Sequence, residues 1–391
     1  MKNLEDLQAN WNYPTSIYFG VGRISALAEC CVELGITRPL LVTDKGLYKL
    51  ALVKNIISLM MAADLGDAVF SEVDANPTEE NILAGVKIFN LGKHDGVIAL
   101  GGGSALDAGK TIALMAGQRR PLWDFEDVGT NWQRVDASAM APTIAIPTTA
   151  GTGSEVGRAS VIVDEVAHKK KIIFHPQMLP ARVIADAELT QGLPAHITAA
   201  TGLDAFVHNF EAYCAPGYHP MADGIALEAM RLIKQWLPRA FENGNDLVAR
   251  SHMLVASSMG ATAFQKGLGA VHALAHPLGA IYNKHHGLLN AILLPYVVLR
   301  NKDLISEQIE HIARCLQLDE ISFLGFYQWL IKFRADLGIP NTLKDIGINA
   351  DEKQRIAKMA VSDPTAATNP IKLSEQDYED LFTNAVQGRL I

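Results

Sequence analysis

The chain has 391 residues, of which 49% are hydrophobic, and it carries a formal net charge of −8 at pH 7. A chain of this size and composition can bury two domain cores, so we expect a soluble globular protein. The acidic balance argues against nucleic acids and anionic membrane surfaces as partners, because both repel a negatively charged protein.

The sequence does not predict a secretory signal, a membrane-spanning helix or a cysteine-based disulfide or metal site. The segment Met1 to Pro14 lacks the apolar core of a secretory signal. The apolar stretch from Gly287 to Leu299 is too short to cross a bilayer and predicts a buried helix. The four cysteines show no C-x-x-C spacing, which argues against a disulfide framework and a thiolate zinc site. We therefore expect a reducing, cytoplasmic setting.

The first half of the chain has an α/β pattern. From Ser16 to about Ile184, short apolar runs alternate with stretches of helical period, which is typical of a parallel sheet with crossover helices. The clearest runs are Pro39–Thr43, Gly96–Leu100 and Thr143–Pro147. Loops at the carboxyl ends of such strands share one rim of the sheet, where ligands bind. This pattern predicts a Rossmann-like domain.

The pattern changes after Leu193. Long stretches such as Met221–Phe241 and Asp246–Phe264 carry apolar residues at helical spacing, and runs typical of strands nearly vanish. We place a boundary near residue 190. The expected organisation is an α/β domain over residues 1–190 and an all-α domain over residues 191–391.

A glycine-rich loop follows the predicted strand Gly96–Leu100. Gly102 and Gly103 allow close approach of a phosphate, and Ser104 begins a helix whose free N–H groups attract anions. These residues and Asp107 are candidates for binding a dinucleotide. The alternative is an ordinary tight turn in which Ser104 or Asp107 caps the helix.

A second loop, Pro147–Glu155, supplies hydroxyl donors through Thr148, Thr149 and Thr152, which suit phosphate or ribose oxygens. Its alternative is a solvated loop with no ligand.

Asp44 directly follows the predicted strand Leu40–Thr43. An acidic side chain at this place can accept hydrogen bonds from the ribose of adenosine and repels a 2′-phosphate, which favours NAD over NADP. The equally weighted alternative is that Asp44 caps the next helix.

Asp204 and His208 are four residues apart in a predicted helix, so both side chains lie on one face and can share a metal ion. A simple hydrogen bond between an aspartate and a histidine is about as common, so this pair alone does not establish a metal site.

Four of the 12 histidines, His272, His276, His285 and His286, fall in one largely apolar segment. A buried neutral imidazole needs a partner, and one metal ion satisfies several imidazoles at once. A carboxylate with imidazoles and no thiolate suits Fe(II), Zn(II), Co(II) or Mn(II). His272 and His276 share a helical face, but their spacing leaves open whether both are ligands.

Four segments together resemble the iron-containing (group III) alcohol dehydrogenase family, in the same order and over nearly the whole chain. They are GGGSALDAGK at Gly101–Lys110, PTTAGTGSE at Pro147–Glu155, GLDAFVH at Gly202–His208 and GLGAVHALAHPLGAIYNKHHG at Gly267–Gly287. The resemblance implies an α/β nucleotide domain, a helical domain and a bound metal.

Carried over by position, the resemblance makes Asp204, His208, His272 and His286 the metal ligands and His276 a catalytic proton relay beside the substrate. Its positions for the cofactor are Asp44, Gly103, Ser104, Thr148, Thr149, Thr152 and Lys170. Lys170 lies in a short basic run, whose neighbours Lys169 and Lys171 are expected on a solvated face.

The resemblance implies that Fe(II) or Zn(II) acts as a Lewis acid while hydride passes between a primary alcohol and NAD(H). It also implies a homodimer. Two alternatives are a zinc-dependent polyol or glycerol dehydrogenase of the same fold and, from another class, a metal-dependent hydrolase. The hydrolase alternative leaves the two glycine- and threonine-rich loops and Asp44 without a role.

Overall fold

A computed structural model describes residue 13, residues 15–167 and residues 169–390. Apart from Tyr13, the N-terminal segment for which no secretory signal is predicted lies outside these residues. The chain forms two compact units, one from Pro14 to Gly192 and one that includes everything from Leu193 onward.

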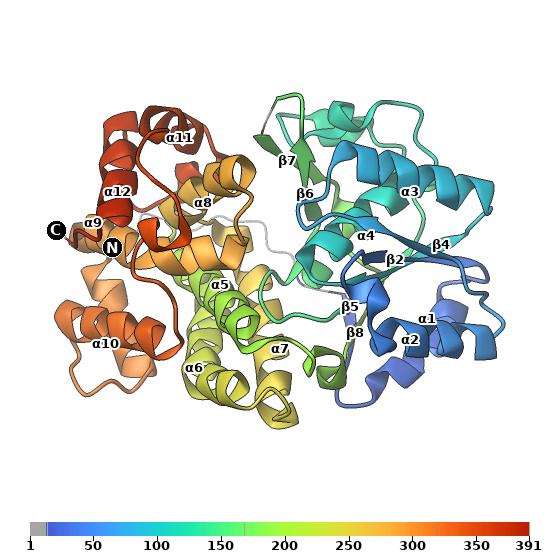
Figure 1. Cartoon of the computed structure of the whole chain (residues 1–391), viewed down its shortest axis with the longest axis horizontal. Helices are drawn as coiled ribbons and strands as arrows, with labels where there is room; N and C mark the ends of the chain where they lie inside the picture. Colours follow the sequence, from blue (N-terminus) through green and yellow to red (C-terminus); the bar gives the residue numbers. More distant parts are fainter. Residues whose placement is uncertain (1–12, 14, 168, 391) are drawn as a thin grey trace. The chain divides into compact units, whose positions relative to one another are not determined.

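The first unit is built on a parallel sheet with helices on both faces (Figure 1). Its sheet strands and main helices are β1 (Ser16–Phe19), α1 (Leu27–Glu33), β2 (Pro39–Asp44), α2 (Ala51–Ala62), β3 (Val69–Val73), α3 (Glu79–Leu91), β4 (Gly96–Gly101), α4 (Gly103–Met115), β5 (Thr143–Pro147) and β8 (Arg182–Ala185). Among the described residues, these six strands pair in the order β1-β8-β5-β4-β2-β3, and every pairing is parallel.

The core of this unit explains why its central strands are continuous apolar runs in the sequence. All residues of β4 and β5 are buried. Ile98, Leu100 and Ile144 pack with buried residues of α1 and α2 such as Cys31 and Ile56, and α3 and α4 lie on the other face of the sheet (Figure 1). Strands covered on both faces need apolar side chains on both faces. The predicted α/β fold is confirmed.

A two-stranded antiparallel sheet, β6 (Ala159–Asp164) and β7 (Lys169–Phe174), contains the basic run. The expectation of a solvated face is wrong for Lys171, whose side chain is only 12% exposed. Its ammonium group lies 2.8 Å from Asp164 and over the ring of Trp123, so ion pairing and aromatic packing offset the cost of burying it.

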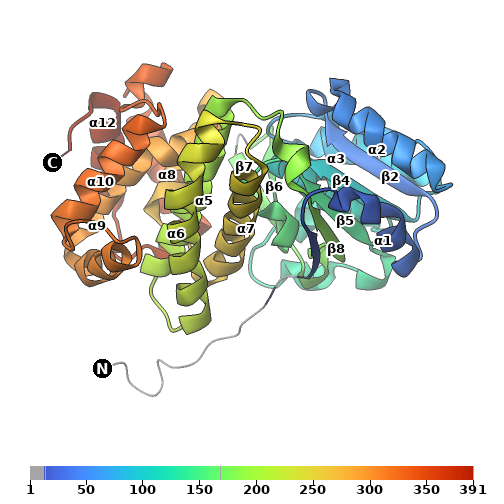
Figure 2. The same ribbon diagram turned by 90° about the horizontal axis from the view of Figure 1, so that it is seen from below.

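The second unit is helical. It contains α5 (Ala195–Cys214), α6 (Pro220–Glu242), α7 (Leu247–Ala263), α8 (Ala270–Tyr282), α9 (His286–Cys315), α10 (Phe323–Asp336), α11 (Lys353–Val361) and α12 (Glu375–Gln387). Within residues 193–390 the structure has no strand, which confirms the predicted all-α region. Helices α5, α6 and α7 run side by side (Figure 2).

The apolar stretch Gly287–Leu299 is a buried part of α9, as predicted. Pro295 lies inside this helix and cannot donate a backbone hydrogen bond to Ala291. Arg334 of α10 compensates, because its guanidinium donates to the carbonyl oxygens of Ala291 and Ile292 at 3.3 and 3.0 Å. Over the described residues, no helix combines the length and the apolar character needed to cross a membrane.

Candidate functional site

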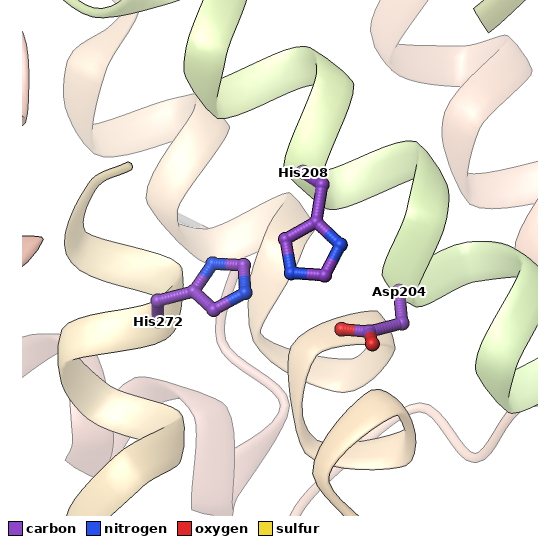
Figure 3. Close-up of side chains that lie close together, drawn as sticks. All are labelled: Asp204, His208 and His272. Carbon is purple, nitrogen blue, oxygen red and sulfur yellow. The ribbon is translucent and has the colours of Figure 1, made fainter. Parts of the chain in front are cut away.

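Helix α5 carries the first two candidate metal ligands. Asp204 and His208 stand four residues apart on one face of the helix, and their side chains point toward the same place (Figure 3). They are 2% and 4% exposed, respectively. Burial of a carboxylate beside an imidazole requires strong polar partners.

His272 of α8 completes a three-residue cluster with this pair (Figure 3). Asp204, His208 and His272 each offer one ligand atom, and these atoms all lie within 4.8 Å of one another. Burial, reinforced by the nearby ring of His208, lowers the pKa of His272 well below its ordinary value. The ring is therefore neutral near pH 7, which is the form that binds a metal.

Glu211, one turn beyond His208, orients His272. Its carboxylate lies 2.6 Å from His272 Nδ1 and accepts from the backbone N–H groups of Gly269 and Val271 at 3.0 and 2.8 Å. Burial raises the pKa of Glu211 to about 7, while these N–H donors favour its ionised form. Since Nδ1 donates to Glu211, Nε2 of His272 keeps its lone pair. Nothing in the sequence pattern marks Glu211 as a partner of His272, although it lies in the same helix as Asp204.

His286 lies at the first position of α9, with Nε2 3.8 Å from Oδ1 of Asp204. Gly287 permits this approach, because a Cβ there would lie 2.5 Å from the carbonyl oxygen of Ala200 in α5. The neighbouring His285 is exposed, and its ring accepts from the backbone N–H of Leu288 at 3.3 Å. Of the two adjacent histidines, His286 is thus the one beside the cluster.

His276 stacks on His286, with ring centroids 5.4 Å apart, and is held by Asp363. Its Nδ1 lies 2.8 Å from the Asp363 carboxylate, which also accepts from the backbone N–H and hydroxyl of Thr365. Burial would raise the pKa of Asp363, but the charge and hydrogen bond of His276 and the Thr365 donors hold it below its ordinary value. An ionised Asp363 accepts from Nδ1, so in the neutral form of His276 the lone pair lies on Nε2.

The donor set fits a divalent cation. One carboxylate and two buried imidazoles converge, and a third imidazole lies next to them. Carboxylate and imidazole donors without a thiolate suit Fe(II) and Zn(II) alike. The ring of His272 is also held from behind by a carboxylate, an arrangement typical of histidines that bind metals.

In the α/β unit, the two predicted loops lie against each other. β4 and β5 end side by side, and the backbone N–H of Thr148 donates to the carbonyl of Gly101 at 3.0 Å. A Cβ on Gly103 would lie 2.7 Å from the side chain of Thr152, and one on Gly102 would lie 3.3 Å from that of Thr149. Only a residue without a side chain fits at Gly103 without displacing Thr152.

The start of α4 has no side-chain cap, since Gly102 stands at the capping position. The hydroxyl of Ser104 donates to the carbonyl of Ala75 at 2.5 Å instead. The first N–H groups of α4 therefore have no side chain of the capping residue as a partner, which suits the binding of an anion.

Asp107 is engaged by the protein itself. Its carboxylate accepts from the hydroxyl of Ser154 at 2.5 Å and the backbone N–H of Val161 at 2.9 Å, and it lies 3.2 Å from the ammonium of Lys110. Lys110 is 1% exposed and also donates to the carbonyl of Ser154 at 3.0 Å. Both side chains thus hold the threonine-rich loop in place, a role that nothing in the local sequence indicates for Lys110.

Asp44 and Lys170 complete the candidate cofactor residues. Oδ1 of Asp44 accepts from the backbone N–H groups of Gly46 and Leu47 at 2.9 and 2.8 Å, so the capping contact of the alternative interpretation is present. Lys170 is half-buried in β7, in register with Val163, and lies in the separate two-stranded sheet.

Comparisons with known proteins cover both units. The family model described as iron-containing alcohol dehydrogenase matches residues 14–187. The model described as Fe-containing alcohol dehydrogenase family, C-terminal, matches residues 198–386.

Individual relatives match over nearly their whole length. The chain is 37% identical over 384 residues to a 4-hydroxybutyrate dehydrogenase of Cupriavidus necator, covering 96% of this chain and 99% of the relative. It is 32% identical to the NAD-dependent methanol dehydrogenase of Bacillus methanolicus, covering 96% and 100%, respectively. A crystal structure of a 1,3-propanediol oxidoreductase superposes with a TM-score of 0.91 at 34% identity and covers 96% of this chain and 100% of that one. The chain belongs to the iron-containing alcohol dehydrogenase family and is an alcohol oxidoreductase.

Proposed function

We propose that the protein interconverts a primary alcohol and its aldehyde with NAD(H) and a bound divalent cation, Fe(II) or Zn(II). The observation that carries this proposal is the convergence of Asp204, His208 and His272 within 4.8 Å in a chain of this family. A metal-dependent hydrolase is disfavoured by the same family membership.

The proposed ligands are Asp204, His208, His272 and His286. A bound divalent cation supplies Lewis acidity toward an alcohol or carbonyl oxygen. Glu211 keeps Nε2 of His272 directed at the cluster through its 2.6 Å contact with Nδ1. Burial of Asp204, His208 and His272 excludes water and strengthens their electrostatic interactions.

His276 is the proposed proton carrier. Asp363 holds its Nδ1 at 2.8 Å, which leaves Nε2 to accept a proton and later release it. A histidine suits this role because its ordinary pKa is close to neutral pH. His276 is therefore assigned to proton transfer, while His272 and His286 are assigned to the metal.

The α/β domain, residues 1–190, is the proposed site of NAD(H), which supplies the hydride acceptor or donor. The main contribution to its binding comes from the glycine-rich loop after β4, the loop Pro147–Glu155 and the uncapped start of α4. There, backbone N–H groups would donate hydrogen bonds to the pyrophosphate. The proposed cofactor residues are Asp44, Gly102, Gly103, Ser104, Asp107, Thr148, Thr149, Thr152 and Lys170. The metal belongs to the helical domain, residues 191–391.

Relatives are named for 4-hydroxybutyrate, methanol and 1,3-propanediol, all primary alcohols. We propose that the substrate of the present chain is also a primary alcohol, without assigning it any one of these three. We further propose a cytoplasmic homodimer that binds no nucleic acid.

The test combines the purified protein, loaded with Fe(II) or Zn(II), with NAD and a panel that contains these alcohols and glycerol. Absorbance of the reduced nicotinamide is recorded. NADH formation with primary alcohols, and its consumption with the matching aldehydes, is expected. Selective turnover of glycerol would favour the polyol dehydrogenase, and a lack of turnover in both directions would refute the proposal.

A further inference from the structure

Asn290, which has not yet been assigned a role, contacts several of the candidate ligand atoms. It is fully buried in α9, one turn after His286. Its amide nitrogen Nδ2 lies 2.7 Å from Oδ1 of Asp204, 3.1 Å from Nε2 of His272 and 3.1 Å from Nε2 of His286. One side chain thus touches three of the four proposed ligands, which come from three different helices.

The polarity of these contacts fixes the orientation of the amide. Asp204 offers a carboxylate oxygen, and His272 offers a lone pair because its Nδ1 donates to Glu211. An N–H donor, and not a carbonyl oxygen, must therefore face them. The carbonyl oxygen Oδ1 of Asn290 is buried and has no hydrogen-bond partner among the described residues. A buried orphan oxygen is unfavourable, so packing alone does not account for an amide at this position.

We propose that Asn290 is a positioning residue of the metal centre, which orients the Asp204 carboxylate and gathers the ring nitrogens of His272 and His286 around one point. This inference rests on the proposed function, because it assigns these three residues to a cation. It adds a residue that acts on the ligands and not on the alcohol or the cofactor.

The two kinds of contact contribute differently. A carboxylate oxygen can accept an N–H and bind a cation at once, because it has more than one lone pair. An imidazole nitrogen has a single lone pair, so it can either accept an N–H or bind a cation, but not both at once. The bond to Asp204 is therefore the one that a bound cation leaves intact. The contacts with the two rings hold their nitrogens in place only before the cation binds, because the cation then takes the same lone pairs.

Removal of the amide should therefore weaken cation binding without unfolding the helix. Asn290→Leu keeps a similar branched shape and removes both polar atoms. Loss of a group that orients metal ligands typically weakens metal affinity by about 10–100-fold. Asn290→Ala is the second variant, in case leucine packs poorly. Asn301→Leu is the matched control, because Asn301 is a buried amide of the same helix that pairs with Asn369.

The experiment measures Co(II) affinity of the full chain by competition with a chelator, together with the visible absorption spectrum of the bound Co(II) and the circular dichroism of each variant. We expect about 10–100-fold weaker binding and an altered Co(II) spectrum for both Asn290 variants, with wild-type behaviour for Asn301→Leu.

Folded Asn290 variants with unchanged or tighter affinity and an unchanged spectrum would overturn the inference alone. Failure of the wild-type chain to bind Co(II) would instead overturn the proposed metal centre, so the two failures are distinguishable. If both Asn290 variants and the Asn301 control lose affinity equally, the amide acts only on the helix, and the inference fails.

Discussion

The helical unit and the α/β unit use their polar side chains in opposite ways. In the helical unit, Asp204, His208 and His272 direct ligand atoms at one another. In the α/β unit, the carboxylates of Asp44 and Asp107 accept from neighbouring N–H and O–H groups of the protein. The arrangement in the helical unit suits a cation. The hydrogen bonds in the α/β unit fix loops whose backbone can bind a ligand. Changes to side chains should therefore impair the metal centre most, whereas added volume in the loops should impair cofactor binding.

The largest expected effect comes from loss of a proposed ligand. Asp204→Ala should weaken cation binding by more than about 100-fold, beyond the loss expected from an orienting group. Alcohol oxidation should disappear, while NADH binding, measured by nicotinamide fluorescence, should remain. Asp303→Ala is the control, because Asp303 is an exposed aspartate of α9. Wild-type cation affinity in Asp204→Ala would remove Asp204 from the metal centre.

A smaller effect on the same centre is expected from Glu211→Gln. The two oxygens of Glu211 accept three N–H donors, so an amide must turn its own N–H₂ toward one of them. Misorientation of His272 should weaken cation binding by about 10–100-fold in chelator competition. Glu228→Gln on the surface of α6 should leave it unchanged. If Glu211→Gln binds the cation as tightly as wild type, Glu211 does not orient His272.

In the α/β unit, Gly103→Ala should act on the cofactor and spare the metal. The added methyl group would lie 2.7 Å from Thr152 and displace the second loop. Overpacking of this kind costs about 1–3 kcal/mol, so we expect roughly tenfold weaker NADH binding in a fluorescence titration. Gly192→Ala is the control, because nothing lies within 4 Å of its Cβ position. Wild-type NADH affinity in Gly103→Ala would show that the loop contact is unimportant.

The smallest expected effect lies away from both sites, at the start of α12. Asp377 accepts from the backbone N–H of Ser374 and from Arg300, and these bonds lower its pKa from 3.8 to about 2. Its contribution to stability is therefore complete above the ordinary pKa and is lost as the pH falls toward 2. Asp377→Asn should reduce the free energy of unfolding by about 1 kcal/mol at pH 7.

Urea denaturation of Asp377→Asn and wild type at pH 7 and pH 3 measures this difference. The gap between the two proteins should shrink at the lower pH. Asp380→Asn on the exposed side of α12 is the control and should match wild type at both. A gap that grows as the pH falls would contradict the assigned pKa shift.

The fold and the pairing of Asp204 with His208 could be predicted because local patterns carry them, whereas the choice of His272 and His286 as candidate ligands came from the family resemblance. Short apolar runs mark the strands of the sheet, and spacing along one helix joins Asp204 to His208. Glu211, Asn290 and Asp363 could not be predicted in this way. Each contacts a histidine of α8 from a different segment of the chain: Glu211 and Asn290 contact His272, and Asp363 contacts His276. Such pairings depend on tertiary packing, and an isolated glutamate or asparagine in a helix is most often an ordinary polar residue.

In the two loops of the α/β unit, position in the sequence also fails to decide the role of a residue. Asp107 fits a cofactor residue or a helix cap by its position in the sequence. The structure shows it bound to Ser154 and Val161, which lie far along the chain. Glycines near strand ends indicate a close approach of the backbone, as at Gly103 beside Thr152, because that geometry depends largely on local sequence.

Reconstitution of the metal tests the central claim most directly. Protein stripped by a chelator is reloaded stepwise with Fe(II) or Zn(II), and bound cation and alcohol-dependent NADH formation are measured on the same samples. We predict that the rate rises in proportion to the bound cation and levels off at about one cation per chain. Full activity in the stripped protein, or bound cation without any NADH formation, would contradict the account.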